Sequence, residues 1–360
     1  MSHPSDSDKN KTGESGPDAD AKDGREASPA GASGDDDWNR YWEHGFMTSC
    51  RNAFAGNYEG ELQEVWHRLF EQLPTGARVL DICTGNGAIA MIANAWSREN
   101  GAGFEIHGID SAAIRPHETV KTDRELLDGI QFHPETPAEA TGLADACFNA
   151  ITGQYAYEYT DEGRTPAELA RIAAPGALIQ LVVHHTDSIV METSRAELEN
   201  CGLIFDETGI FEHARAMIEI VASVAPEARK ELQHNPEAER RREQLNDAAA
   251  RVSDALRRSP HPQLLQMTLD KVAEAFKVLP ASGLAAAIEH LDTSREMVSA
   301  NRERLLDLMK AGRSAEQIAR SLAAFEAAGF EMRAPKEIRH DGGPLMGWVL
   351  GGQRHDPGTA

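Results

Sequence analysis

Short apolar runs alternate with amphipathic segments through the middle of the chain. Each apolar run is strand-length and ends at polar or glycine-rich residues, whereas the segments between them have helical spacing. This alternation predicts parallel strands joined by helices over residues 76–188. We expect strands at Arg78–Asp81, Phe104–Ile109, Ile130–Phe132, a fourth ending at Gly153 and Gln154, and Ala177–Val183, with a helix at Thr165–Ala173 before the fifth.

The pattern changes on both sides of this core. Residues 38–75 form an aromatic-rich N-terminal helical segment whose apolar stripe, from Leu62 to Leu73, should pack on the sheet. Residues 189–314 read as long helices with no strand between them, which predicts a helical insertion. Residues 315–354 return to the core pattern with a helix at Ala315–Ala328 and strands at Phe330–Ile338 and Met346–Gln353.

Composition restricts the class of protein. Residues 1–37 lack an apolar core, so we expect a disordered acidic tail rather than a targeting segment, with a second short tail at 355–360. No run approaches the roughly 18 apolar residues of a membrane span. The net charge of −22 opposes binding to nucleic acid. The four cysteines show no metal or disulfide spacing, and we expect a cytoplasmic protein without a metal.

The stretch RVLDICTGNGAIA, residues 78–90, carries the most chemistry. An apolar strand ends at Asp81, and a turn containing Thr84, Gly85 and Gly87 opens into a helix. Glycines let a ligand approach the backbone, and the first turn of a helix offers unpaired N–H groups. The sequence GNGAIA lacks the third glycine of a dinucleotide fingerprint, so a pyrophosphate is not the expected ligand.

This stretch resembles the first motif of the class I S-adenosylmethionine-dependent methyltransferases. The resemblance covers roughly Trp66–Asp187 and Ala315–Arg354. It implies a Rossmann-like, seven-stranded, mostly parallel sheet with helices on both faces, and S-adenosyl-L-methionine as cofactor. In such a fold the helical insertion forms a lid or a dimer surface, so a homodimer through it is an expected interaction.

The resemblance also implies cofactor-binding residues. Asp110, at the tip of the second strand, accepts the ribose hydroxyls in this reading, although alone it could be a helix cap. The chain departs from the family at Cys83, where a glycine is usual, and at Thr136 or Pro137, where a carboxylate usually meets the adenine amine. The implied cofactor set is Asp81, Thr84, Gly85, Gly87, Asp110, Ser111, Thr136, Pro137, Ala138, Gly153 and Gln154.

Candidate catalytic residues follow the fifth strand, where ligands bind in open parallel sheets. His184 and His185 could remove a proton from an acceptor, or hydrogen-bond within their loop. Because neighbours on an extended segment face opposite ways, we expect only one to reach the pocket. Tyr157 is a third catalytic candidate. Nothing matches HExxH or another metal spacing.

Aromatic residues supply the candidate substrate wall. Tyr155, Tyr157 and Tyr159 follow the fourth strand and could contact an acceptor or pack under the insertion. Trp38 and Trp42 could close over the pocket or fix the N-terminal segment to the sheet. We therefore expect a methyltransferase acting on a small-molecule nucleophile through O, N or S, with no nucleic-acid or membrane partner. The alternatives are a protein methyltransferase and a non-catalytic, S-adenosylmethionine-binding regulatory protein.

Overall fold

The computed structural model describes residues 34–49, 56–121 and 123–356. Most of the predicted acidic tail and the last four residues lie outside this part. Helix α1 (Gly34–Glu43) begins within the segment assigned to the tail. Among the described residues, no helix combines the length and the apolar content needed to cross a membrane.

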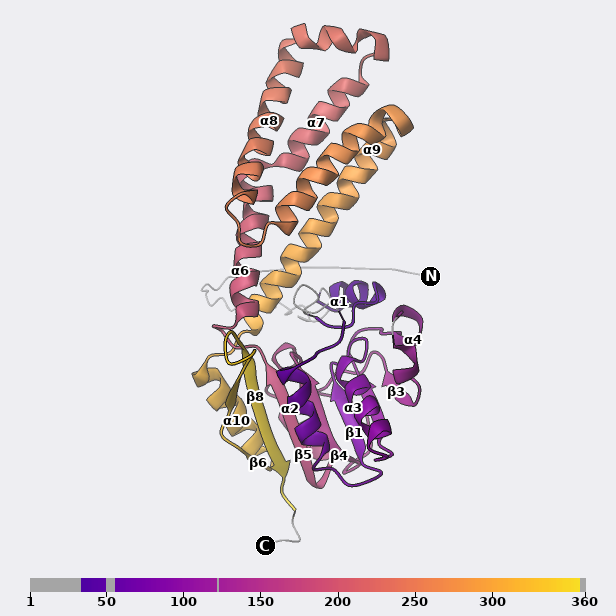
Figure 1. Ribbon diagram of the computed structural model, residues 1–360, viewed down its shortest axis with the longest axis vertical. Coiled ribbons are helices and arrows are strands. Elements are labelled where there is room, and N and C mark those ends of the chain that lie inside the picture. Colours follow the sequence, from indigo (N-terminus) through magenta and orange to yellow (C-terminus); the bar gives the residue numbers. More distant parts are fainter. Residues whose placement is uncertain (1–33, 50–55, 122, 357–360) are drawn as a thin grey trace, which may run out of the picture.

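The centre of the molecule is a mixed sheet whose strands run in the order β3-β2-β1-β4-β5-β8-β6 (Figure 1). The first five strands are parallel, and β8 pairs antiparallel with β5. This is the expected Rossmann-like α/β arrangement. The strands are β1 (Arg78–Ile82), β2 (Glu105–Ile109), β3 (Ile130–His133), β4 (Phe148–Gln154), β5 (Ala173–Val183), β6 (Phe330–Met332), β7 (Lys336–Arg339) and β8 (Leu345–Arg354).

The last edge strand differs from the sequence expectation. Instead of one strand over Phe330–Ile338, β6 and β7 pair with successive parts of β8. The interruption contains Pro335, which has no N–H to give to a strand ladder. The edge position of the predicted seven-stranded sheet is therefore filled by two short strands.

Helices cover both faces of the sheet and bury separate apolar layers. On one face, α2 (Glu61–Phe70) and α3 (Ala88–Glu99) pack through Trp66, Phe70 and Met91. On the other, α5 (Thr165–Ile172) and α10 (Ala315–Ala327) pack around Phe325 and its neighbours. The shorter elements are α4 (Pro116–Thr119) and the 3-10 turns η1 (Arg124–Leu126) and η2 (Tyr157–Tyr159).

A helical arm, residues 189–311, rises from the end of the sheet at which β5 finishes (Figure 1). It has an apolar core of its own, distinct from the two layers on the sheet. Its elements are α6 (Ile189–Gly202), the π-helical turn η3 (Leu203–Thr208), α7 (Ile210–Ala222), the 3-10 segment η4 (Pro226–His234), α8 (Pro236–Leu256) and α9 (Gln263–Ala311).

Helix α9 folds back on itself at Gly283, whose φ of 88° and ψ of 178° are not helical. The two halves lie side by side, since His290 Nε2 is 3.4 Å from Glu274 Oε2. In a straight helix, the rise of about 1.5 Å per residue would put these residues about 24 Å apart. The arm therefore ends in a helical hairpin, and the second half of α9 returns to the sheet (Figure 1).

We expect Gly283→Ala to destabilise the chain by about 1–3 kcal/mol, because this backbone region is open almost only to glycine. A Cβ at Gly283 would meet nothing within 4 Å, so strain is the cause rather than a clash. Gly202→Ala is the matched control, since Gly202 has helical φ and ψ of −57° and −45°. Urea unfolding measures both variants. Equal stability of the two would contradict the turn.

Candidate functional site

A cavity of about 1080 Å³ lies at the carboxyl ends of the parallel strands. Its walls come from the turns after β1, β2 and β3, from the end of β4 and the loop that follows, from the segment around α1, and from the last turn of α9. Ligand pockets usually measure about 300–1,000 Å³, so this cavity is large for a ligand site.

The turn after β1 is fastened to the tip of β2 by a carboxylate. Asp110 Oδ2 accepts the backbone N–H of Gly85 at 2.8 Å, and Oδ1 accepts that of Ala112 at 2.9 Å. Asp110 is buried but lines the cavity. Carboxylate oxygens accept hydrogen bonds, so a ligand hydroxyl in the cavity has an acceptor within the wall at Asp110.

Asp81, at the end of β1, is a second buried carboxylate in the wall. Its oxygens accept the hydroxyls of Thr84 at 2.6 Å and Thr152 at 3.0 Å. Burial raises the pKa of Asp81 to about 7, against the lowering effect of these hydrogen bonds. Asp81 is therefore held in place by the protein, and its carboxyl group is partly protonated near neutral pH.

Aromatic side chains from α1 cover the glycine turn. Gly85 has φ of 53°, and a Cβ there would lie 2.5 Å from Cζ2 of Trp42. The indole of Trp42 thus fills the space that glycine leaves, where a ligand was expected. Trp38 stacks on Trp42 with centroids 5.7 Å apart and meets Tyr159 edge-on at 5.6 Å.

Asn86 holds this aromatic cover in place. Its side-chain amide donates to the carbonyls of Trp42 at 3.0 Å and Phe46 at 2.8 Å, and its oxygen accepts the hydroxyl of Thr119. Asn86 is fully buried. A residue inside the glycine motif therefore positions the N-terminal segment, a role that the motif itself did not indicate.

The loop after β4 directs its aromatic residues in two directions. Tyr155 and Tyr159 line the cavity, whereas Tyr157 packs on Phe325 of α10 and donates to the carbonyl of Glu162. A 3-10 turn has three residues per turn, so residues two apart do not share a face. Tyr157 therefore lies outside the cavity wall, and this position does not support its expected catalytic and substrate-binding roles.

Glu158, between Tyr157 and Tyr159, is a buried acid that the sequence analysis did not identify as a site residue. Its side chain lines the cavity and is 7% exposed. Oε1 accepts the backbone N–H of His184 at 2.7 Å, while Oε2 is buried with no hydrogen-bond partner in the described residues. Burial raises the pKa of Glu158 to about 7, although the charge of Arg313 lowers it.

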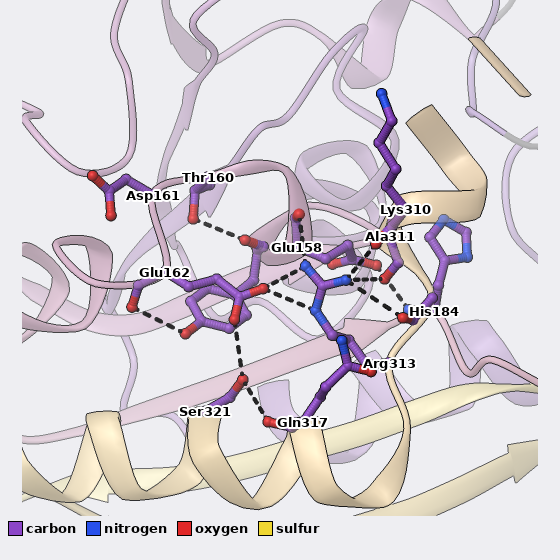
Figure 2. Close-up of polar contacts among 12 residues, drawn as sticks. Glu158, Thr160, Asp161, Glu162, His184, Lys310, Ala311, Arg313, Gln317 and Ser321 are labelled. Carbon is purple, nitrogen blue, oxygen red and sulfur yellow. Dashed lines mark hydrogen bonds and ion pairs between the residues drawn. The ribbon is translucent and has the colours of Figure 1, made fainter. Parts of the chain in front are cut away.

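Arg313, just after α9, joins the arm to this loop (Figure 2). Its Nε donates to Glu162 at 2.8 Å and its Nη2 to the carbonyl of Glu158 at 3.0 Å. Its backbone N–H donates to the carbonyl of His184 at 2.9 Å, and its carbonyl accepts from Thr186. Lys310, one turn earlier, forms an ion pair with Asp307 at 2.8 Å, and all three side chains line the cavity.

Neither histidine lines the cavity, so the expectation that one of them is the catalytic base is not supported. The bridge to Arg313 fixes residues 184–186, and the ring of His184 is stacked on Tyr155 at 4.1 Å, fully buried. Burial lowers its pKa to about 3. His185 stacks on Trp348 at 4.5 Å instead. The two rings do lie against different partners, but both are packed behind the cavity wall.

The remaining predicted residues divide between the wall and its support. Gly87 caps α3 and abuts Phe132, Thr136 donates its N–H to the carbonyl of Asp110 at 2.7 Å, and Gly153 packs on Ile82. The predicted residues that line the cavity are Asp81, Thr84, Asp110, Ser111, Pro137, Ala138, Gln154, Tyr155, Tyr159, Trp38 and Trp42.

Other cavity residues come from segments without a recognisable motif. Met47, Thr48 and Tyr58 belong to the N-terminal segment, and Asp307 and Lys310 to the far end of the arm. Only tertiary packing brings them to the sheet. In the described part of the chain, no group of three or more His, Cys, Asp and Glu side chains is arranged to hold a metal ion.

Comparison with known proteins agrees with this geometry. Residues 54–250, just over half of the chain, match the model of a family described as "Methyltransferase domain". No curated protein matches the sequence.

Solved structures give weaker likenesses. The chain is 20% identical to the [4+2]-cyclase SpnF, over 39% of this chain and 50% of the cyclase, with a TM-score of 0.30. It is 17% identical to geranyl diphosphate methyltransferase with sinefungin, over 34% of this chain and 44% of that enzyme, with a TM-score of 0.29. It is 21% identical to a SAM-dependent methyltransferase from Aquifex aeolicus, over 34% of this chain and 64% of that enzyme, with a TM-score of 0.29. The chain thus spans about half the length of the first two, and scores this low carry no argument about activity.

The raised pKa of Glu158 predicts a pH-dependent stability. The folded chain keeps this proton up to about pH 7, whereas the ordinary pKa is 4.5. Stability therefore falls as pH rises from about 4.5 to about 7 and then levels off. Glu158→Gln removes this loss, so the variant should gain up to about 3 kcal/mol over the parent chain at pH 8 and nothing at pH 4.5.

Urea unfolding at both pH values measures the difference. Asp187→Asn is the control, because Asp187 is an exposed acid outside the cavity. A stability gain for Glu158→Gln that is the same at both pH values would contradict the raised pKa.

Proposed function

The chain belongs to the class I S-adenosylmethionine-dependent methyltransferase superfamily, and we propose that it methylates a small-molecule nucleophile bound in the cavity. The observation that carries this proposal is the set of buried polar atoms without partners in the cavity wall. Within the described residues, Thr48 Oγ1, Gln154 Nε2 and Glu158 Oε2 have none. Buried polar atoms are nearly always hydrogen-bonded, so these three are matched to ligands.

The donors and acceptors in the wall fit S-adenosylmethionine. Asp110 is a buried carboxylate in the wall at the tip of β2, the position suited to accept the ribose hydroxyls, with Ser111 beside it. The unpaired amide N–H of Gln154 is suited to a carboxylate, because its oxygen already accepts the indole N–H of Trp66 at 2.7 Å. Pro137 and Ala138 offer an apolar surface for adenine. We assign the cofactor to this side of the cavity.

The acceptor then lies against the aromatic side, between α1, the loop after β4 and the end of α9. Trp38, Tyr155 and Tyr159 line this side. The cofactor supplies a methyl group for in-line transfer to the acceptor atom. The chain's own residues orient the acceptor and exclude water, which are the main contributions to such a reaction.

A protein acceptor and a non-catalytic, regulatory role are the other outcomes of the test. The aromatic cover and the end of α9 both lie over the strand ends, which favours a small acceptor. The helical arm as a dimer surface, and a cytoplasmic location, remain predictions.

Methyl-labelled S-adenosylmethionine separates these functions. We expect label to enter the small-molecule fraction of a cell extract and not the protein fraction. Label in protein alone would favour the protein methyltransferase. Binding of the cofactor with no transfer to either fraction would favour the regulatory role.

Asp110→Ala tests the cofactor assignment. We expect at least about tenfold weaker binding of S-adenosylmethionine, because hydrogen bonds to a charged group contribute about 1.5–3 kcal/mol. Calorimetry gives the affinity. Asp110→Asn is the milder variant, since its oxygen can still accept the N–H of Gly85. Unchanged affinity in both folded variants would refute the assignment.

A further inference from the structure

We propose that the methyl acceptor is an amine and that Glu158 binds it and takes its proton. This inference rests on the proposed function and specifies the substrate class of the same cavity. The sequence pattern indicates roles for the tyrosines of the loop after β4 but none for Glu158 between them.

The free oxygen of Glu158 is the first observation. Oε1 accepts the backbone N–H of His184, which restrains the carboxylate of a residue that lines the cavity. Oε2 has no partner among the described residues, although the side chain is more than nine-tenths buried. The neighbouring basic groups do not neutralise it: Arg313 is paired with Glu162, and the low pKa of His184 keeps its ring neutral. A buried carboxylate with one unpaired oxygen is stabilised by a hydrogen-bond donor, and most strongly by a cationic donor.

The charge of the wall is the second observation. Its cationic side chains, Lys310 and Arg313, are paired with Asp307 and Glu162. An anionic acceptor, such as a carboxylate or a phosphate, would meet an excess of negative charge. The acids that line the cavity are Asp81, Asp110, Glu135, Glu139, Glu158, Asp161 and Asp307.

The aromatic side chains next to Glu158 are the third observation. Tyr155 and Tyr159 flank it along the chain and line the same cavity, and Trp38 meets Tyr159 edge-on at 5.6 Å. Aromatic faces attract ammonium groups, more strongly when water is excluded. Aromatic faces and one buried acid together distinguish an ammonium from a neutral alcohol of the same size.

The chemistry balances with the groups present. An amine enters as its ammonium, which has no lone pair for attack, and its proton moves to Oε2 of Glu158. The nitrogen lone pair then forms the bond to the methyl carbon as the methyl–sulfur bond breaks, and the sulfur keeps that electron pair. The product is a methylated ammonium. Glu158 returns its proton to solvent when the product leaves, which a carboxyl with a pKa of about 7 does readily at neutral pH.

Three probes of similar size test the inference: 2-phenylethylamine, 2-phenylethanol and phenylacetate. Each is titrated calorimetrically into the full chain saturated with S-adenosylhomocysteine at pH 8, where Glu158 is ionised. We expect the amine to bind at least about tenfold more tightly than the alcohol, and phenylacetate to bind most weakly. Equal affinities for amine and alcohol, or preference for phenylacetate, would overturn the inference.

Glu158→Gln should remove the preference for the amine and leave the affinities for the alcohol and for S-adenosylhomocysteine within about twofold. Asp187→Asn, which removes an exposed carboxylate outside the cavity, should leave all of them unchanged. Loss of S-adenosylhomocysteine affinity in Glu158→Gln would place Glu158 on the cofactor and overturn the inference. If the parent chain does not bind S-adenosylhomocysteine, the proposed function itself fails. If it binds S-adenosylhomocysteine but not the amine, only the amine inference fails.

Discussion

The ion pair of Arg313 with Glu162 is the constraint on which the arrangement of arm, sheet and cavity depends. A guanidinium stays charged at any relevant pH and has five donors, so a largely buried one must be satisfied by several acceptors at once. Here they are Glu162, the carbonyl of Glu158 and carbonyls in the last turn of α9 (Figure 2). The backbone of Arg313 also bridges residues 184–186, which lead into the arm. Both ends of the arm are thus fixed at one point on the cavity wall.

The contacts of Arg313 also position the side chain of Glu158. The same segment that receives Arg313 presents the N–H of His184 to Oε1 of Glu158. Without these contacts, the buried carboxylate of Glu158 would be free to rotate toward water and become hydrated. Held in place, it bears the cost of burial, which is visible in its raised pKa. In the proposed complex, the ammonium group of the acceptor donates to Oε2 and offsets that cost.

Local sequence signals predicted several residues at the strand ends that form one wall of the cavity. Asp81, Gly85 and Asp110 occupy the ends of neighbouring strands because strand order and the glycine turn follow from patterns a few residues long. Tyr157 lies away from the cavity because it belongs to a 3-10 turn, a local geometry that the sequence pattern did not indicate. Arg313 lies beyond the whole arm, and no local pattern brings it beside Glu158. Long-range packing forms the opposite wall of the cavity, and local patterns in a single sequence do not reveal such packing.

Cys83 lies in the turn after β1 and contributes to the cavity wall. It stands where the family usually has glycine, and its φ of 47° is one that a residue with a side chain adopts only at a cost. Its thiol lines the cavity between Asp81 and Thr84, and burial together with the nearby acids raises its pKa well above the ordinary value. The thiol therefore stays protonated and adds no further negative charge to an acid-rich wall. The strained backbone at Cys83 thus places a small, neutral side chain in the cavity wall, beside the glycine turn whose open space Trp42 fills.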